Sequence, residues 1–318
     1  MLRVVLSRLG AFVPTLLVTS VILFIAVNVV PGSAARAALG IDATPQAIAR
    51  FEHEQGLDRP LHVQYLDWLG KALRGDLGSS FQNRVPVSKE IVMRLPITMQ
   101  LAVMAFLVAI LVALPLGSLA AYYHQKPADI GITLFATLMG AVPNFWLATL
   151  LILLFGLTLR WLPVGGYVSL WEDPVKNLRQ MIMPALSLGL VSSALLLRIM
   201  RADMIEVLGS DYIRSALAKG ASPGVVIWRH AVRNALIPFL TVGAVEFGWL
   251  FGGVVIIEDI FRLPGLGSLV LVGIINRDYP VLLASVLVIT TVVLTANLVV
   301  DLVALVLDPR HVQTRTVQ

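Results

Sequence analysis

The stretch ITMQLAVMAFLVAILVALPLGSLAAY, residues 97–122, contains no charged side chain. An α-helix needs about 20 apolar residues to cross the hydrocarbon core of a bilayer, so this segment is long enough to span a membrane. The whole chain has the matching composition, since 58% of its 318 residues are hydrophobic and only 14% are charged. A water-soluble domain carries a larger charged surface, and the composition therefore indicates an integral membrane protein.

Five further segments have the length and apolarity of a membrane span. They are Leu9 to Ala35, Ile130 to Leu159, Met181 to Leu197, Ala235 to Ile257 and Tyr279 to Leu307. We therefore predict an all-α integral membrane protein with six transmembrane helices. Its predicted parts are an N-terminal helix (1–35), an extracytoplasmic loop region (36–96) and a five-helix core (97–318).

The first segment also has features of a cleavable signal peptide. Arg3 and Arg8 precede its apolar run, and the small-residue stretch PGSAARA follows it. The apolar run is about twice as long as the 7–15 residues typical of a signal peptide. We interpret it as the first transmembrane helix.

Lys and Arg residues are distributed unevenly among the predicted loops. With the N-terminus inside, the inner segments hold 11 of them, the two short outer loops hold 5, and loop 36–96 holds the other 8. Short cytoplasmic loops carry an excess of Lys and Arg, whereas long loops cross the membrane largely regardless of charge. We predict that both termini lie in the cytoplasm and that the helical loop 36–96 is exported. The net charge of +5 then reflects membrane orientation, and we expect no nucleic-acid partner.

Motifs of catalysis and of cofactor binding are absent from the sequence. It contains no HExxH, GxSxG or GxxxxGK[ST] motif, and it contains no cysteine. The stretch RFEHEQGLDRPLH (50–62) gathers acids and histidines, but Gly56 and Pro60 interrupt the helix that would place metal ligands at i, i+4 on one face. We interpret this stretch as a solvated helix and turn, and we expect neither an enzyme, nor a metal site, nor a cofactor in this chain.

Polar groups within the predicted spans are candidates for function, because a bilayer disfavours them. Glu246 lies in the middle of the fifth span, where it either bonds to a neighbouring helix or lines a water-filled path. Gly248 and Gly252 permit close approach of a helix or of a passing solute. Trp249 and Asn144 complete the set of candidate pathway residues.

The segment DYIRSALAKGASPGVVIWRHAVRNALIP, residues 211–238, is basic and amphipathic and lies between the fourth and fifth spans. Ser210 or Asp211 is expected to cap a helix that runs through Lys219 and stops at Gly220. The small apolar face of this helix, formed by Ile213, Ala216 and Leu217, suits a groove on a partner protein. The alternative, a basic helix lying on anionic lipid, leaves the alanine-rich face and the glycine stop unexplained.

This segment resembles the cytoplasmic EAA loop of the membrane subunits of binding-protein-dependent ABC importers. The match consists of Arg214-Ser215-Ala216, then three intervening residues, then Gly220. Arginine in place of glutamate at the first position, and the late Leu236-Ile237-Pro238, are both typical of the dipeptide, oligopeptide and nickel permease branch. Other stretches that resemble this branch are FIAVNVVPG (24–32), GLDRPLHVQYLDWLGKALRGDLGSSF (56–81), RLPITMQL (94–101), VPNFWLATLLILLF (142–155), WLPVGGY (161–167), IIEDIFRLPGLGSLV (256–270), NRDYPV (276–281) and NLVVDLVALVLDPR (297–310).

The resemblance implies the permease subunit of an ATP-driven importer of peptides or related small solutes, located in the bacterial cytoplasmic (inner) membrane. A second, usually non-identical permease would complete the pathway, and an exported solute-binding protein would deliver the solute. Two ATPase subunits, which bind ATP and Mg, would dock on the cytoplasmic loop 198–234. The implied coupling residues are Asp211, Tyr212, Ile213, Arg214, Ala216, Leu217, Lys219, Gly220 and Ala221, and those implied near the binding protein are Phe261, Pro264, Gly265 and Gly267.

One alternative from another functional class is a self-powered transporter or channel that uses Glu246 or Asp301. Such proteins are often built from inverted repeats with functional groups in both halves. Here both acids lie in the last two spans, and Asp301 with Asn297 is interpreted as a hydrogen-bonding pair between helices. The importer interpretation is therefore favoured, and an acid at Glu246 suggests a cationic or amine-bearing solute.

Overall fold

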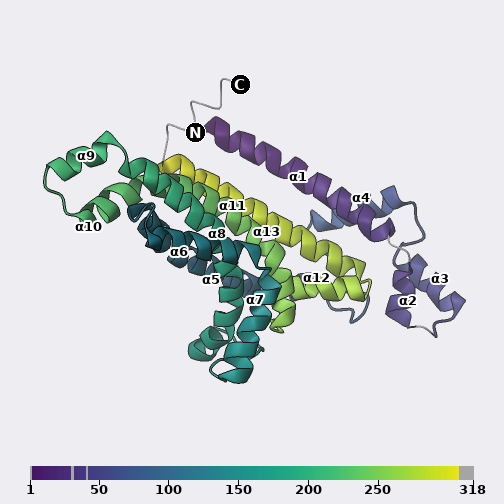
Figure 1. Cartoon of the computed structure of the whole chain (residues 1–318). Coiled ribbons are helices and arrows are strands. Elements are labelled where there is room, and N and C mark those ends of the chain that lie inside the picture. Colours follow the sequence, from purple (N-terminus) through teal and green to yellow (C-terminus); the bar gives the residue numbers. More distant parts are fainter. Residues whose placement is uncertain (1, 30–31, 41, 308–318) are drawn as a thin grey trace. The chain divides into compact units, whose positions relative to one another are not determined.

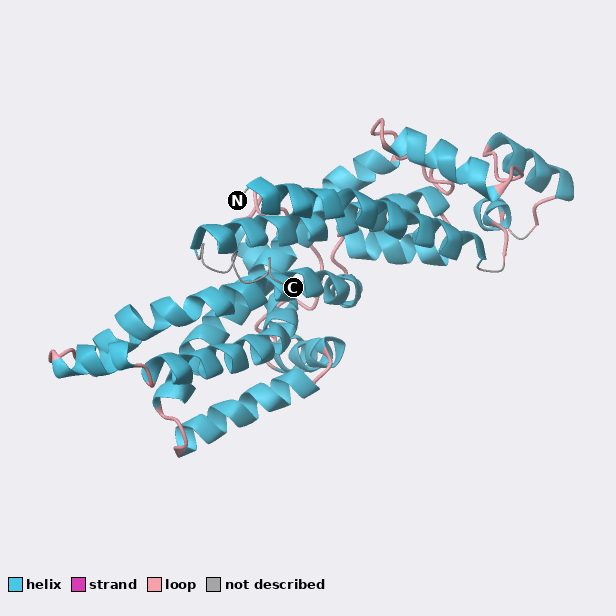
Figure 2. Ribbon diagram, turned by 90° about the horizontal axis from the view of Figure 1, so that it is seen from above, coloured by secondary structure: helices cyan, strands magenta, loops and turns pink. Residues whose placement is uncertain are grey.

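The computed structural model describes residues 2–29, 32–40 and 42–307, without the side chains of residues 2–9, 11, 223 and 300–307. Throughout these residues the regular elements are helices, and strand-like pairing is limited to one isolated bridge between Ser79 and Pro86 (Figure 2). Within the described residues, five helices are long and apolar enough to cross a membrane, or six if one sharply bent pair forms a single span. The predicted all-helical membrane fold is confirmed.

The bent pair is the third predicted span. Helices α6 (Pro127–Ala141) and α7 (Asn144–Leu151) meet at an angle of 102°. Between them Val142 is extended, with φ −85° and ψ 125°, because a residue before proline is disfavoured in the helical conformation. The π-helix η1 (Ile152–Thr158) continues α7. The sequence predicted one continuous helix here, and the structure shows a broken one.

The described chain divides into two compact units. The first contains residues 100–262 and 295–307, with α8 (Pro174–Leu208) packed against α6, α7 and α11 (Val232–Ile260). Helix α5 (Val87–Tyr122) approaches α8 so closely that a Cβ atom on Gly189 would lie 2.4 Å from the carbonyl oxygen of Ala105. Because that neighbour is backbone, which cannot move aside cheaply, glycine is required at this contact.

A shorter set of helices joins α8 to α11 (Figure 1). These are α9 (Asp211–Ala218), the single turn α10 (Pro223–Val225) and the π-helix η2 (Val226–Ala231). Buried apolar side chains from α8, α9, η2 and α11 form one core cluster, which includes Met200, Ile213, Ala231 and Phe239. The segment between the two spans is thus folded against its own unit.

The second unit contains residues 2–99 and 263–294. Its elements are α1 (Leu2–Val29), α2 (Ala34–Leu39), α3 (Pro45–Glu54), α4 (Leu61–Ala72), the start of α5, α12 (Leu266–Ile275) and the start of α13 (Tyr279–Leu307). The aromatic rings of Tyr65 and Trp68 on α4 pack against Phe24 of α1, with ring centroids 5.4 and 6.3 Å apart. The predicted division at residues 35 and 96 concerns membrane topology and remains a prediction.

Within this unit, Asp278 connects two segments that are far apart in the sequence. Its carboxylate, which is 3% exposed, accepts hydrogen bonds from the hydroxyl of Ser80 (2.5 Å) and from the backbone N–H groups of Phe81 (3.1 Å) and Gln82 (3.4 Å). Charged acceptors form stronger hydrogen bonds than neutral ones. The carboxylate therefore fixes loop 75–86 to the turn between α12 and α13.

Candidate functional site

Helix α9 begins and ends close to where the sequence predicts. Ser210 is its N-cap residue, although the hydroxyl donates to the carbonyl of Val207 (2.6 Å) and accepts no bond from α9. At the other end Gly220 has φ +83°, Gly220 N donates to the carbonyl of Leu217 (2.9 Å), and Ala221 N donates to that of Ala216 (3.2 Å). These two bonds form a Schellman motif, which needs a left-handed residue and therefore favours glycine. The glycine stop is confirmed.

The exposed surface of α9 differs from the predicted docking face. Ile213 is 1% exposed and belongs to the core cluster of its own unit, so the structure corrects its assignment to a partner's groove. Ala216 is half-buried, whereas Tyr212 and Leu217 are 52% and 50% exposed. Ile213 therefore holds α9 in place, and Tyr212, Leu217 and Lys219 form the available apolar and basic surface.

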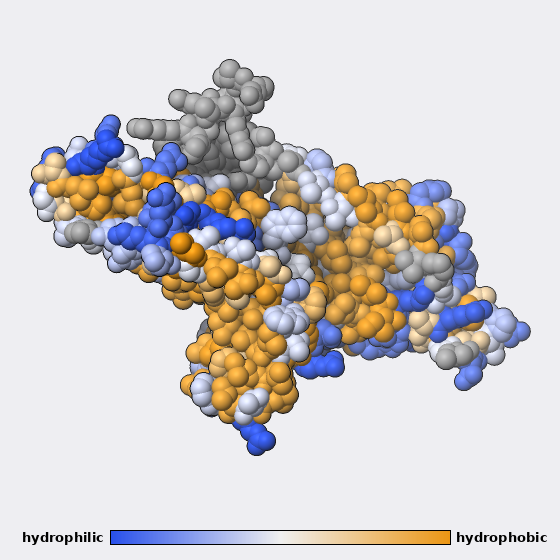
Figure 3. Space-filling model, in the orientation of Figure 1, coloured by the Kyte–Doolittle hydropathy of each residue, from blue (hydrophilic) through white to orange (hydrophobic). Residues whose placement is uncertain are grey.

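Polar contacts fix α9 to the next segment. The hydroxyl of Tyr212 lies 2.6 Å from Nδ1 of His230 on η2, and the two rings are in edge-to-face contact with centroids 5.6 Å apart. Arg214 forms only an exposed pair with Asp211 (3.4 Å), and such pairs contribute little to stability. The part of the surface that carries α9 and α10 shows hydrophobic residues with hydrophilic residues beside them (Figure 3). The segment thus presents a basic, partly apolar surface on a fixed backbone.

The candidate pathway residues of α11 lie on two sides of that helix. Trp249 is 75% exposed, and Gly252 has open space where a Cβ would be. Val245 and Ile256 are exposed on the same face, at helical spacing. Gly248 and Glu246 are half-buried, and the carboxyl of Glu246 lies near Ser192 on α8. Ser192 is therefore a candidate partner for Glu246 if this residue bonds to a neighbouring helix.

Asn144 lies beside α11 at the start of α7. A Cβ atom on Gly253 would be 2.4 Å from the amide nitrogen of Asn144 and 2.8 Å from a methyl carbon of Leu188. The close helix approach expected of the glycines in this stretch therefore occurs at Gly253, while Gly252 faces open space. The structure thus places Asn144 next to the candidate pathway helix.

The residues expected near a binding protein are mostly buried. Phe261 is 0% exposed, its carbonyl accepts a hydrogen bond from Gly166 N (3.2 Å), and Gly265 and Gly267 are also buried. Pro264 alone of these four residues is exposed. In the described conformation the three buried residues pack the turn between α11 and α12, and their expected position near a binding protein remains a prediction.

The histidine-containing stretch of the N-terminal loop region forms α3 and a turn at Gly56, where φ is +68°. His53 Nδ1 lies 2.8 Å from Asp58 Oδ2, and this hydrogen bond holds the pKa of the Asp58 carboxyl below its ordinary value. Among the residues that the structure describes, no group of three or more His, Asp or Glu side chains is arranged to hold a metal ion.

Asp301 and Asn297 both lie on α13. The side chain of Asp301 is outside the described residues, so its expected pairing has no structural test. The carbonyl oxygen of the Asn297 side chain is buried without a hydrogen-bond partner in the described part of the chain.

Two polar contacts in the structure were not predicted from the sequence: the ion pair between Asp129 and Arg201, and the hydrogen bonds that the carboxylate of Asp278 accepts. Each joins residues far apart in the sequence, and a local pattern does not reveal such pairs. The sequence offers only a weak indication of these two contacts. Opposite charges at the ends of two apolar segments on the same predicted side of a membrane invite pairing, because an unpaired charge is costly there.

Comparison with known protein families identifies the class. Residues 113–313 match the model of the binding-protein-dependent transport system inner membrane component, and residues 1–102 match that of the N-terminal region of such membrane components. The chain belongs to this family of inner membrane transport components.

Curated relatives match over nearly the whole length. A protein of Brucella suis biovar 1, provisionally named a peptide transport system permease protein, is 40% identical over 98% of this chain and 99% of its own. A protein of Sinorhizobium fredii, provisionally named a peptide ABC transporter permease, is 36% identical over 96% and 98%. A glutathione transport system permease protein of Salmonella choleraesuis is 38% identical over 97% and 98%.

Family membership confirms several predictions. The chain is the multi-pass inner membrane permease of a binding-protein-dependent ABC importer, a non-catalytic component that works with a binding protein and an ATPase. The alternative of a self-powered transporter is not supported. The roles of individual residues do not follow from family membership and remain predictions.

Proposed function

We propose that this chain imports peptides or related small solutes by forming half of a translocation pathway with a second, homologous permease subunit. The proposed substrate class is supported by similarity to permeases named for peptide or glutathione transport, which extends over at least 96% of the chain. The proposed orientation places both termini and α9 in the cytoplasm, as the distribution of Lys and Arg supports.

Helix α9 is the proposed docking element for one of two ATPase subunits, which would bind ATP and Mg. Two features of this helix support the proposal. Buried Ile213 holds the helix in place and Gly220 ends it, while the side chains of Tyr212, Leu217 and Lys219 are exposed. Such a short, anchored helix with an apolar and basic surface suits a groove that contains acidic residues at its rim. The exposed face of α11, around Trp249 and Gly252, is the proposed wall of the pathway, with Asn144 and Glu246 beside it.

The helical region 36–86 and the exposed Pro264 are proposed to face the binding protein on the outer side. The length of the loop supports this proposal, because long loops are exported largely regardless of their charge. A second support is its folded state, since Asp278 and the aromatic contacts of α4 hold the region in a defined shape.

Co-purification tests the proposal. The tagged chain is extracted from its host in mild detergent, and the associated proteins are identified by mass spectrometry. We expect a second membrane permease, ATPase subunits and an exported binding protein, with a peptide released from that binding protein on denaturation. A chain that purifies alone or as a homo-oligomer, without ATPases, would contradict the proposal, and a non-peptide solute would contradict the substrate class only.

A further inference from the structure

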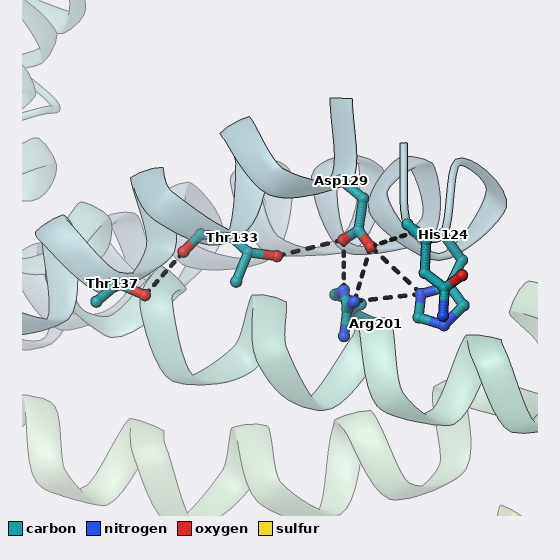
Figure 4. Close-up of polar contacts among 6 residues, drawn as sticks. His124, Asp129, Thr133, Thr137 and Arg201 are labelled. Atoms are coloured by element: carbon teal, nitrogen blue, oxygen red, sulfur yellow. Dashed lines mark hydrogen bonds and ion pairs between the residues drawn. The ribbon is translucent and has the colours of Figure 1, made fainter. Parts of the chain in front are cut away.

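A buried ion pair joins α6 to α8 (Figure 4). The carboxylate of Asp129, which is 3% exposed, accepts hydrogen bonds from Arg201 Nε to Oδ1 (2.6 Å) and from Arg201 Nη2 to Oδ2 (2.8 Å). Two parallel bonds between a guanidinium and a carboxylate fix both distance and angle, and they are stronger than bonds between neutral groups. The pair therefore resists sliding and rotation of one helix against the other.

Neighbouring groups complete the surroundings of the carboxylate. The backbone N–H of Gln125 donates to Oδ2 (2.9 Å), and the hydroxyl of Thr133 donates to Oδ1 (3.3 Å). His124 Nδ1 lies 3.3 Å from both Asp129 Oδ2 and Arg201 Nη2. Asp129 also lies in the first turn of α6, where the helix dipole favours a negative charge. The site is thus built to keep this carboxylate ionised and oriented.

The same two helices are in close contact further along. A Cβ atom on Gly140, near the end of α6, would lie 3.4 Å from Cβ of Ala194 and 3.5 Å from Nη2 of Arg198, both on α8. Helix α6 is therefore fastened to α8 near both of its ends, by an ion pair at one and by close packing at the other. A helix held at two points moves with its neighbour as one body.

The position of the pair connects the two parts of the proposed mechanism. Arg201 lies on the last two turns of α8, just before Asp211 begins α9. Helix α6, which carries Asp129, ends at the 102° break, and Asn144 beyond that break lies against Gly253 of α11. A displacement of α9 would therefore reach Asn144 by one route through α8, the ion pair and α6, in addition to the direct packing of α8 against α11.

We propose that Asp129 and Arg201 are a positioning pair for energy coupling, which makes α6 follow α8 when the ATPases displace α9. The inference rests on the proposed docking of α9. Without the pair, α8 slides past the start of α6, and this end of α6 no longer follows the movement of α8. Neither residue touches ATP or solute, and both act through the helices that they join.

The test measures whether α6 and α8 move together. The chain has no native cysteine, so spin labels attach only at Gly131→Cys on α6 and Ala202→Cys on α8. Both positions are exposed, and a Cβ atom at Gly131 meets no neighbour within 4 Å. Pulsed electron paramagnetic resonance gives the distance between the labels in the complete complex with cysteine-free partner subunits, before and after trapping with ATP and vanadate.

The decisive variant is the double substitution Asp129→Asn with Arg201→Gln. Removing one partner alone leaves the other charge buried and unpaired, whereas neutralising both avoids that penalty, so we expect the double variant to reach the membrane in larger amounts than either single variant. Thr133→Val is the matched control, because it removes a hydrogen bond to the same carboxylate and keeps the ion pair.

With the pair intact, and in Thr133→Val, we expect the same label distance in both nucleotide states. In the double variant we expect the distance to change on trapping by at least roughly 2 Å, the scale of helix shifts in switching proteins, while ATP hydrolysis continues. An unchanged distance in the double variant, with ATP hydrolysis retained, would overturn the inference. Failure of the unaltered chain to bind ATPases would instead overturn the proposed docking of α9, so the two failures are distinguishable.

Discussion

Replacement of Gly220 by residues with a Cβ atom tests the docking geometry of α9. Gly220 has φ +83°, and no atom of the protein lies within 4 Å of the position that a Cβ would occupy. Steric crowding in the protein therefore plays no part, and the effect of Gly220→Ala comes from backbone strain alone. The left-handed conformation costs an L-residue about 1–2 kcal/mol.

In the free Gly220→Ala variant the end of α9 is expected to relax to another conformation, and the cost then arises when docking requires the Schellman motif to form again. A cost of about 1–2 kcal/mol corresponds to roughly 5- to 30-fold in an equilibrium constant, so we expect ATPase subunits to bind Gly220→Ala that much more weakly. Gly220→Asn is expected to bind nearly as well as the unaltered chain, because asparagine adopts the left-handed conformation more readily than alanine. Gly220→Glu adds a charge at the docking surface, and we expect transport to fail while the chain still reaches the membrane.

The assay is a titration of purified ATPase subunits onto the permease in lipid nanodiscs, read as a dissociation constant. Gly224→Ala is the matched control, because this glycine lies in the same segment, also has open space around it, and has no positive φ. Equal binding by Gly220→Ala and the unaltered chain would refute the strain argument. An equal loss in Gly224→Ala would show that the segment responds to any substitution.

Two further predictions concern other parts of the chain. Asp278→Ala leaves the Ser80 hydroxyl and two backbone N–H groups without their acceptor, so we expect the free energy of unfolding to fall by about 2 kcal/mol. Thermal unfolding in detergent measures this loss. Asp76→Ala is the control, because it removes one exposed hydrogen bond and is expected to have a smaller effect. An equal loss in the two variants would contradict the clamp. Glu246→Gln keeps a hydrogen-bonding group near Ser192 and removes the charge. We therefore expect uptake of amine-bearing peptides to fall by roughly tenfold. Uptake of peptides whose amine is blocked is expected to change little. Equal uptake of both kinds of peptide by this variant would show that Glu246 does not select solutes.

The predictions from the sequence succeeded where a property depends on neighbours in the chain. A run of apolar residues has the length of a membrane span whatever surrounds it, and five of the six predicted spans are long apolar helices in the structure. The end of α9 at Gly220 is similarly local, because a left-handed residue is most readily a glycine. Even the break in the third span has a local cause, the proline at 143, although hydropathy alone did not reveal it.

Properties that depend on residues far apart in the sequence were decided only by the tertiary structure. Ile213 has the same apolar side chain in either setting, and only the packing of α8, η2 and α11 around it makes it an anchor of α9 instead of a contact for a partner. The pair of Asp129 with Arg201 spans 72 positions, and that of Ser80 with Asp278 spans 198. The sequence by itself determined that the chain crosses a membrane and where its short basic helix lies, because hydropathy and backbone conformation act locally. Which charges meet, and which face of that helix remains exposed, depend on long-range contacts that form only when the helices pack.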